Sequence, residues 1–203
     1  SIQHCTIKYL REGYKPPNST GGSFHIDYND FWGIGGDCVQ ISPYDVNPPV
    51  NNSINFNRIY APVALGSDTG DHLDAIQFTA AGAAKTTVFT GCDLIGNLIT
   101  DLFGRGQFQF GFISDQDPTG WWQNLQFKGN LMMAKGGNSQ MPAIDHIVGG
   151  YLFANVSTTS VPGAVVPTKP NFLPSGVTGQ ESNYVGYNLV CLINADANCQ
   201  YEN

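Results

Sequence analysis

Charged residues are scarce in this sequence, and long apolar runs are absent. Only 12 % of the 203 residues are charged, which argues against a coiled coil, long amphipathic helices and charge-driven disorder. The 16 acidic residues outnumber the 9 lysines and arginines, so the formal net charge is −7. This charge repels a phosphate backbone, and no run of about 18 apolar residues occurs. The sequence therefore predicts neither a nucleic-acid partner nor a membrane span.

Metal-binding and nucleotide-binding motifs are lacking as well. The five cysteines form no Cys-x-x-Cys pair, so no zinc site is expected, although Cys191 and Cys199 could close a small loop. The sequence has no Gly-x-Ser-x-Gly, phosphate-loop or dinucleotide motif. Calcium at Asp115 and Asp117 is the one possible cofactor. The chain opens at Ser1 without a leader, so we expect a processed chain or part of a longer one.

A five-residue pattern recurs along the chain. Asp37–Ile41 and Asp74–Phe78 both read Asp, small residue, apolar residue, Gln, apolar residue. Further apolar strands are predicted at nearly the same interval, at Phe110–Ser114, Gly150–Phe153 and Asn188–Cys191. A recurrence of this length indicates a repeat architecture.

A second series of short segments alternates apolar and polar residues. It comprises Ile54–Ile59, Val88–Leu94 and Leu125–Leu131, with similar segments at Ile2–Ile7 and Phe24–Phe31. A period of two predicts strands with one buried face. No segment of ten or more residues has a helical period, so helices should be nearly absent.

The two series predict an all-β fold. Propeller blades and sandwiches use tight hairpins, and their Asn-Gly and Asp-Gly turns are missing here. A parallel solenoid of about five coils fits better, with Gln40 above Gln77 and Asp37 above Asp74. We assign the coils to residues 1–155, and an irregular Pro- and Gly-rich segment with one terminal strand to residues 156–203.

Three segments resemble a known superfamily. Val88–Gly96 (VFTGCDLIG) and Leu125–Met133 (LQFKGNLMM) each run from an apolar strand into an Asn or Asp turn. Asp71–Gln77 is similar to the H-x-D-[GA]-I-Q segment of β-helix repeat proteins from bacteria and their phages. The resemblance is to the right-handed parallel β-helix of the pectate-lyase-like superfamily, which includes secreted proteins and phage tailspikes. It implies a polysaccharide partner and an extracellular or virion-surface location. A homotrimer or larger assembly is expected for a different reason: the open ends of a solenoid can pair with other chains, and no convincing cap is seen at Ser1.

The candidate catalytic residues lie at the start of the two copies of the repeat or just before the second. Asp37, Asp71, His72 and Asp74 form an expected acid/base cluster, because paired carboxylates raise one pKa and an imidazole exchanges a proton near neutrality. In the alternative interpretation, the aspartates cap turn N–H groups and Gln40 and Gln77 form a ladder that satisfies its own amides.

Substrate-binding candidates are aromatic, basic and amide side chains. An exposed indole can stack on a sugar face, and one ring of a tandem pair on a strand must point outward. Arg58 and Arg105 could hold an acidic sugar, but the excess of acid favours ordinary ion pairing. The substrate-binding candidates are Gln40, Gln77, Trp32, Trp121, Trp122 and Arg58.

Two functions remain open at this point. The first is a carbohydrate-active β-helix that binds polysaccharide and, if it is an enzyme, cleaves it as a lyase or glycoside hydrolase. The alternative is a noncatalytic structural or adhesion β-helix of a virion or cell surface.

Overall fold

The computed structural model describes residues 1–10, 13–15, 23–41, 50–60, 73–78, 88–101, 108–109, 112–113, 121–134, 143–144, 147–159, 171–172, 184–186, 188–192 and 198–202. These residues form strands and turns, and none of them lies in a helix. The predicted all-β class and the near absence of helices are confirmed for this part of the chain.

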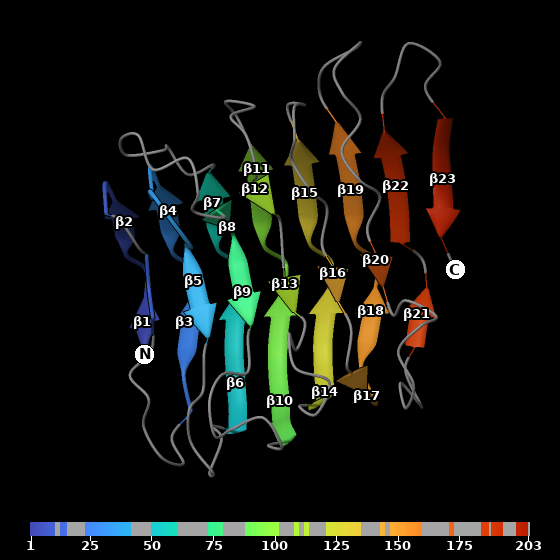
Figure 1. Ribbon diagram of the computed structural model, residues 1–203, viewed down its shortest axis with the longest axis horizontal. Helices are drawn as coiled ribbons and strands as arrows, with labels where there is room; N and C mark the ends of the chain where they lie inside the picture. The colour runs from blue at the N-terminus through green and yellow to red at the C-terminus, as the bar shows by residue number, and fades with distance from the viewer. Residues whose placement is uncertain are drawn as a thin grey trace.

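Two long sheets run the length of the molecule (Figure 1). Sheet A contains, in order, β1 (Ile2–Gln3), β3 (His25–Asp27), β6 (Val50–Asn55), β10 (Val88–Ile95), β14 (Trp121–Lys128), β18 (Tyr151–Phe153) and β21 (Tyr184–Gly186), with β17 (Ile147–Val148) beside β14. Sheet B contains β2 (Thr6–Lys8), β4 (Asp30–Trp32), β7 (Arg58–Tyr60), β11 (Leu98–Asp101), β15 (Leu131–Ala134), β19 (Val156–Thr159), β22 (Asn188–Leu192) and β23 (Asn198–Glu202).

A third sheet completes the arrangement. Sheet C contains β5 (Val39–Ile41), β9 (Ile76–Phe78), β13 (Phe112–Ile113), β16 (Ala143–Ile144) and β20 (Asn171–Phe172), and a short pair joins β8 (Leu73–Asp74) to β12 (Phe108–Gln109). Neighbouring strands are parallel throughout, except that β22 and β23 are antiparallel. Parallel sheets built from successive passes of the chain are the arrangement of a β-solenoid.

Inward side chains of sheets A and B stack into apolar columns. In sheet A, Leu94 lies beside Phe127, and Phe127 beside Leu152, and all three are buried. In sheet B, Phe31 lies beside Ile59 and is completely buried. The alternation seen in the sequence thus places one face of each strand in the core, where apolar burial stabilises the fold by about 25 cal/mol per Å².

A row of buried asparagines follows the turn between sheets A and B. Successive members are 28, 40, 33 and 25 residues apart in the chain, and each is at most 1 % exposed. Each of the five precedes the first residue of a sheet B strand. We call this row the asparagine ladder: Asn29, Asn57, Asn97, Asn130 and Asn155.

Every rung of the ladder uses both ends of the amide. Asn97 Nδ2 donates to Asn130 Oδ1 at 3.0 Å and to the Ile54 carbonyl at 2.8 Å. Asn97 Oδ1 accepts from both the backbone N–H and the Nδ2 of Asn57, at 3.0 and 3.1 Å. A carboxamide has both donors and acceptors, so one residue type can repeat in a buried stack with its hydrogen bonds made.

The residue before each rung adopts a left-handed backbone conformation. Its φ is +59° at Tyr28, +54° at Phe56 and +65° at Gly96. The rings of His4, Tyr28 and Phe56 stack, with centroids 5.1 Å apart. A Cβ at Gly96 would lie 2.6 Å from the Phe56 ring, so glycine serves both the left-handed turn and the close approach of this ring.

The first predicted series of strands needs a correction. Its first three members stack as expected, as β5, β9 and β13 of sheet C. The last two do not, because Gly150–Phe153 coincides with β18 of sheet A and Asn188–Cys191 with β22 of sheet B. The neighbours of β13 in sheet C are β9 and β16. The number of residues per pass varies, as the spacing of the asparagine ladder shows. A strand predicted at a constant interval is therefore assigned to the wrong sheet after a few passes.

Parallel pairing continues beyond Asn155. Strand β19 pairs with β15, β21 with β18, and β22 with β19. The terminal strand expected from the sequence is therefore present, whereas most of the Pro- and Gly-rich stretch lies outside the described residues. Cys191 and Cys199 are opposite each other in the β22–β23 register. A division of the chain at residue 155 stays a prediction.

Candidate functional site

The two repeat segments stack in the predicted register. Gln40 of β5 is paired with Gln77 of β9, and their side chains are joined by a hydrogen bond of 2.8 Å from Gln40 Nε2 to Gln77 Oε1. Asp37 and Asp74 also meet, because Asp37 Oδ1 accepts the Asp74 backbone N–H at 3.2 Å. The geometry expected for these four residues is observed at the start of the two strands.

A directional chain of hydrogen bonds leads into this cluster. Lys15 Nζ donates to Gln40 Oε1 at 2.7 Å, and Gln40 Nε2 then donates to Gln77 Oε1. Gln77 Nε2 donates to Asp74 Oδ2 at 2.9 Å. The chain has an ammonium group at one end and a carboxylate at the other, so both amide orientations are fixed. We call it the glutamine relay: Lys15, Gln40, Gln77 and Asp74.

Asp74 itself is closed off from solvent. The residue is 2 % exposed, and its Oδ1 has no hydrogen-bond partner in the described part of the chain. Burial raises the pKa of Asp74 to about 7, the charge of Asp37 adds to this, and the hydrogen bond from Gln77 opposes it. Asp74 can exchange a proton near neutrality, but a polymer cannot reach its carboxylate in this conformation.

The other members of the predicted cluster lie outside the described residues. These are Asp71 and His72, and the same holds for Arg105 and for the calcium candidates Asp115 and Asp117. The structure brings together Asp37, Asp74, Gln40 and Gln77. A catalytic role for Asp37, Asp71, His72 and Asp74 stays a prediction.

A separate candidate site, which the sequence analysis missed, is the outer surface of sheet A. Outward side chains of neighbouring strands line up along the sheet: His25 is paired with Ser53, Ser53 with Asp93, and Asp93 with Gln126. Gln126 is paired with Tyr151, and Tyr151 with Tyr184. A parallel row begins at Asp27 and includes Asn55, Lys128 and Phe153. We call these ten residues the sheet A face: His25, Asp27, Ser53, Asn55, Asp93, Gln126, Lys128, Tyr151, Phe153 and Tyr184.

The N-terminal end of the sheet A face is an internally bonded polar group. Asp27 Oδ2 accepts from the Ser53 hydroxyl at 2.8 Å, and Asp27 Oδ1 accepts the Asn55 backbone N–H at 2.9 Å. His25 Nδ1 lies 2.8 Å from the Ser53 hydroxyl oxygen. Since that hydroxyl donates to Asp27, the imidazole nitrogen is the donor in this contact. Asp27 is therefore buried with both oxygens occupied.

The centre of the sheet A face presents polar groups of a different kind. Asp93 and Gln126 are half-buried and adjacent. Neither side chain has a hydrogen-bond or ion-pair partner among the described residues. A partly exposed carboxylate and amide that have no partner in the described part of the chain can bond to the hydroxyl groups of a ligand.

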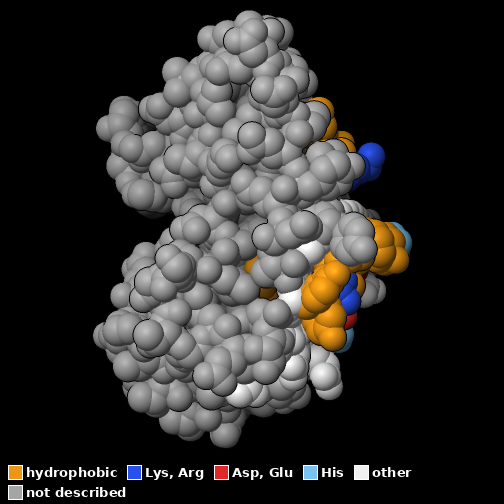
Figure 2. All heavy atoms as spheres, turned by 90° about the vertical axis from the view of Figure 1, so that its right-hand side faces the viewer, with side chains coloured by type: hydrophobic (Ala, Val, Ile, Leu, Met, Phe, Trp, Pro, Cys, Tyr) orange, Lys and Arg blue, Asp and Glu red, His pale blue; other side chains and the backbone are white. Residues whose placement is uncertain are grey.

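The C-terminal end of the sheet A face is aromatic. Tyr151 and Tyr184 are 46 % and 43 % exposed, and the Tyr184 ring lies 5.9 Å from both the Tyr151 and the Phe153 rings. Lys128 Nζ is 4.8 Å from the centre of the Tyr151 ring, within range of a cation–π interaction. Figure 2, which views this end of the molecule, shows hydrophobic side chains gathered along one margin.

Polar positions within strands carry the signal for this surface. The outward residues of Phe24–Phe31, Gly91–Leu94 and Leu125–Leu131 largely alternate with the core residues. Period two alone therefore marks Asp93, Gln126 and Lys128 as outward. It does not show which strands are neighbours, and the rows become visible only with the register.

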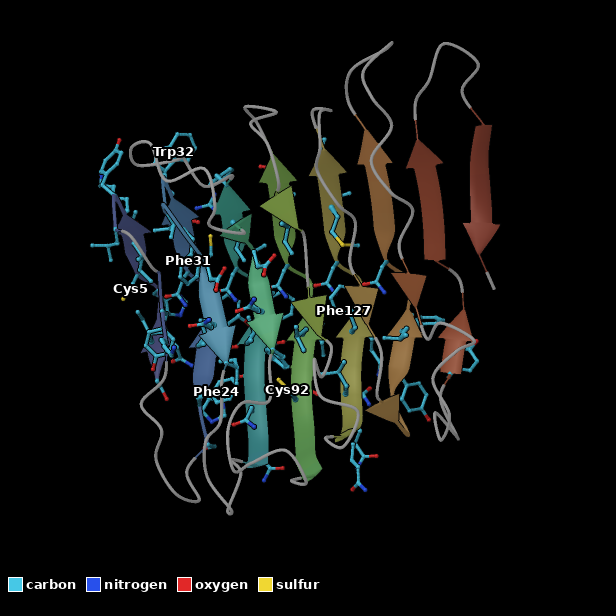
Figure 3. All side chains as sticks on the ribbon, viewed as in Figure 1. Cys5, Phe24, Phe31, Trp32, Cys92 and Phe127 are labelled. Carbon is cyan, nitrogen blue, oxygen red and sulfur yellow. The ribbon has the colours of Figure 1, made fainter. Side chains whose placement is uncertain are left out.

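The remaining predicted side chains lie on sheets A and B. Arg58 pairs with Asp30, donating from Nη2 to Oδ2 at 2.6 Å, so the expected ordinary ion pair is confirmed. Trp32 packs edge-on against Tyr60 at 5.1 Å, and it lies at the upper margin of Figure 3, on sheet B. Trp121 and Trp122 are paired with Val88 and Phe89 in sheet A, and their side chains are outside the described set.

No family model, no curated protein and no solved structure matches this chain. Among the described residues, no helix is long and apolar enough to cross a membrane.

Proposed function

We propose that the chain is a glycan-binding β-solenoid and that the sheet A face holds the glycan. The observation that carries the proposal is the continuous outward row from Asp93 through Gln126 to Tyr151 and Tyr184. Adjacent parallel strands are about 4.8 Å apart. The row therefore offers binding groups at regular intervals along an extended surface, which suits a polymer of repeated sugar units.

The chemistry of the row matches the two kinds of surface on a sugar. Sugar hydroxyl groups both donate and accept hydrogen bonds, and Asp93 and Gln126, which have no partner in the described ranges, provide groups of both kinds. The apolar face of a sugar ring stacks on aromatic rings, and the exposed rings of Tyr151 and Tyr184 can accept such a contact. The polar and the aromatic side chains follow one another along the sheet, so a single glycan chain can contact both.

The same surface favours binding over cleavage. Hydrolysis of a glycosidic bond uses two carboxyl groups about 5–9.5 Å apart that both reach the substrate. Asp93 is accessible, whereas Asp27 is buried and holds hydrogen bonds from Ser53 and Asn55. Asp74 is buried on another sheet pair. We therefore propose a binding role, with catalysis by the cluster around Asp74 as the alternative.

The finer description of the fold belongs to the same proposal. We propose a right-handed parallel β-helix of the pectate-lyase-like kind, since parallel crossovers in one sheet are right-handed in nearly all proteins. The path of sheet A includes seven strands in chain order, so the proposed helix has more coils than the five expected from sequence.

Location is proposed from the resemblance to the pectate-lyase-like superfamily, and assembly from the edges of the sheets. We propose an extracellular or virion-surface location and a homotrimer or larger assembly. Strands β1 and β2 lie at sheet edges, and an uncovered edge can pair with another chain. Light scattering at micromolar concentration tests this, and a monomer contradicts it.

A glycan panel tests the function. The chain is screened against neutral and acidic polysaccharides, and released reducing ends and new double bonds are measured in parallel. We expect binding to at least one glycan without cleavage, and weaker binding after Tyr184→Ala. Cleavage that is lost in Asp74→Asn supports the catalytic alternative. Absence of binding across the panel supports the noncatalytic structural role.

A further inference from the structure

One buried carboxylate oxygen has no partner. Among the described residues, Asp74 Oδ1 is the sole carboxylate oxygen that is both buried and without a hydrogen bond. A buried unsatisfied oxygen costs about 1–3 kcal/mol, and more if it is charged. The fold therefore holds this atom in an unfavourable state unless a ligand contacts it.

The surroundings of Asp74 supply a second carboxylate. Asp37 lies on the neighbouring pass and accepts the Asp74 N–H through Oδ1. Backbone bonds hold the two passes together, since Cys38 N–H donates to the Asp74 carbonyl at 2.9 Å. Gly13 N–H donates to the Asp37 carbonyl at 2.9 Å, and a Cβ at Gly13 would lie 2.2 Å from the Cys38 carbonyl oxygen. The two carboxylates are thus fixed beside each other by three packed passes.

The glutamine relay favours the ionised form of Asp74. Each amide in the relay donates toward Asp74 and accepts from the side of Lys15. A donor aimed at Oδ2 stabilises a carboxylate more than a carboxylic acid. A proton on Oδ1 removes the charge and so weakens this charge-assisted hydrogen bond, whereas a cation on Oδ1 leaves it intact.

We propose that Asp74 Oδ1 and the carboxylate of Asp37 bind a hard cation of the calcium class. A cation contacts the unpartnered oxygen and offsets the repulsion between the two negative charges in one step. Calcium prefers carboxylate, carbonyl and water oxygens, and two protein carboxylates make a weak site. We expect a dissociation constant of about 0.1–1 mM, as in extracellular calcium modules. This proposal does not depend on glycan binding.

Calcium titration of the whole chain tests the site. The protein is stripped with a chelator, and its thermal unfolding is followed with calcium, with magnesium and without either. At a calcium concentration of about ten times the dissociation constant, we expect the melting temperature to rise by about 3 °C or more. Equilibrium dialysis with labelled calcium should find this site in addition to any other, and Asp74→Asn should remove one bound ion per chain.

Matched variants separate a specific site from general charge effects. Asp93→Asn makes the same charge change on the sheet A face, and it should leave the calcium response unchanged. Asp37→Asn should weaken the response as Asp74→Asn does, which provides a second variant if one of them does not fold. The proposal is overturned if calcium does not stabilise the wild-type chain, or if both Asp37→Asn and Asp74→Asn keep the full response and the full number of bound ions.

Discussion

Two polar stacks in this protein both place identical side chains on successive passes, and they differ in their chemistry. In the asparagine ladder, identical amides repeat from pass to pass, and each one donates and accepts. In the Asp37–Asp74 pair, identical carboxylates repeat in the same way, but ionised carboxylates only accept. Asp74 Oδ1 is left without a partner. Stacking in register therefore stabilises a solenoid when the repeated side chain is amphoteric, and it creates a charged defect when the side chain is an acid.

Removal of one residue of the asparagine ladder should lower the free energy of unfolding. Asn97→Ala leaves the Asn57 amide without its acceptor and the Ile54 carbonyl without its side-chain donor. We expect a loss of about 3 kcal/mol in the free energy of unfolding, because each unpaired buried group costs about 1–3 kcal/mol. Urea denaturation measures it. Gln126→Ala, an outward amide, is the control and should change stability by less than about 0.5 kcal/mol; equal losses in both variants contradict the ladder's role.

Neutralising Asp74 should raise the free energy of unfolding. Asp74→Asn removes the buried charge beside Asp37 and keeps a side chain of nearly the same shape. In chelator at pH 8, we expect the free energy of unfolding to rise by about 2 kcal/mol. Asp93→Asn makes the same change at a half-buried position outside the pair and should be nearly neutral. A destabilised Asp74→Asn protein in chelator at pH 8 counts against this description of the pair.

The pH dependence of stability sharpens the same point. The folded pKa of Asp74, about 7, lies above its ordinary value of 3.8, so the folded state holds the proton more tightly than the unfolded chain. The contribution of this group is therefore fully present below about pH 4 and is lost as pH rises toward 7. Unfolding free energies measured in chelator from pH 4 to pH 8 should fall more steeply for wild type than for Asp74→Asn. Parallel curves contradict this.

The smallest effect on stability is expected on the sheet A face. Tyr184→Ala removes an exposed ring, so stability should change by less than about 1 kcal/mol, while affinity for a bound glycan should fall about tenfold, or about 1.4 kcal/mol. Tyr28→Asn removes another exposed ring at a left-handed turn that asparagine tolerates. Its glycan affinity, measured by calorimetry, should equal that of wild type. Equal losses in the two variants place the glycan elsewhere.

The register of the acidic pair could be predicted from sequence, but the ladder could not. Gln40 and Gln77 lie in two segments of similar sequence that are 37 residues apart. Such sequence similarity identifies stacked positions directly. The ladder residues are separated by 25 to 40 residues, because the loops between strands can vary in length at little entropic cost. A fixed period therefore finds Asp37 and Asp74 but misses Asn97 and Asn130.

The same variation explains the misplaced strands and the missed surface. Continuing a constant interval from β13 leads past β16 to β18, which belongs to another sheet. Once the register is wrong, the outward residues of β10, β14 and β18 cannot be aligned into a row. Alternation predicts the exposure of Asp93 and Gln126, whereas their adjacency depends on long-range pairing.

The position of a bound glycan tests the central claim most directly. A crystal structure of the chain with the best ligand from the panel should show sugar rings along the outside of β10, β14 and β18, with a hydroxyl group hydrogen-bonded to Asp93 or Gln126 and a ring stacked on Tyr151 or Tyr184. A glycan bound at another surface, above all one whose scissile bond lies against Asp37 and Asp74, would contradict the assignment of the sheet A face.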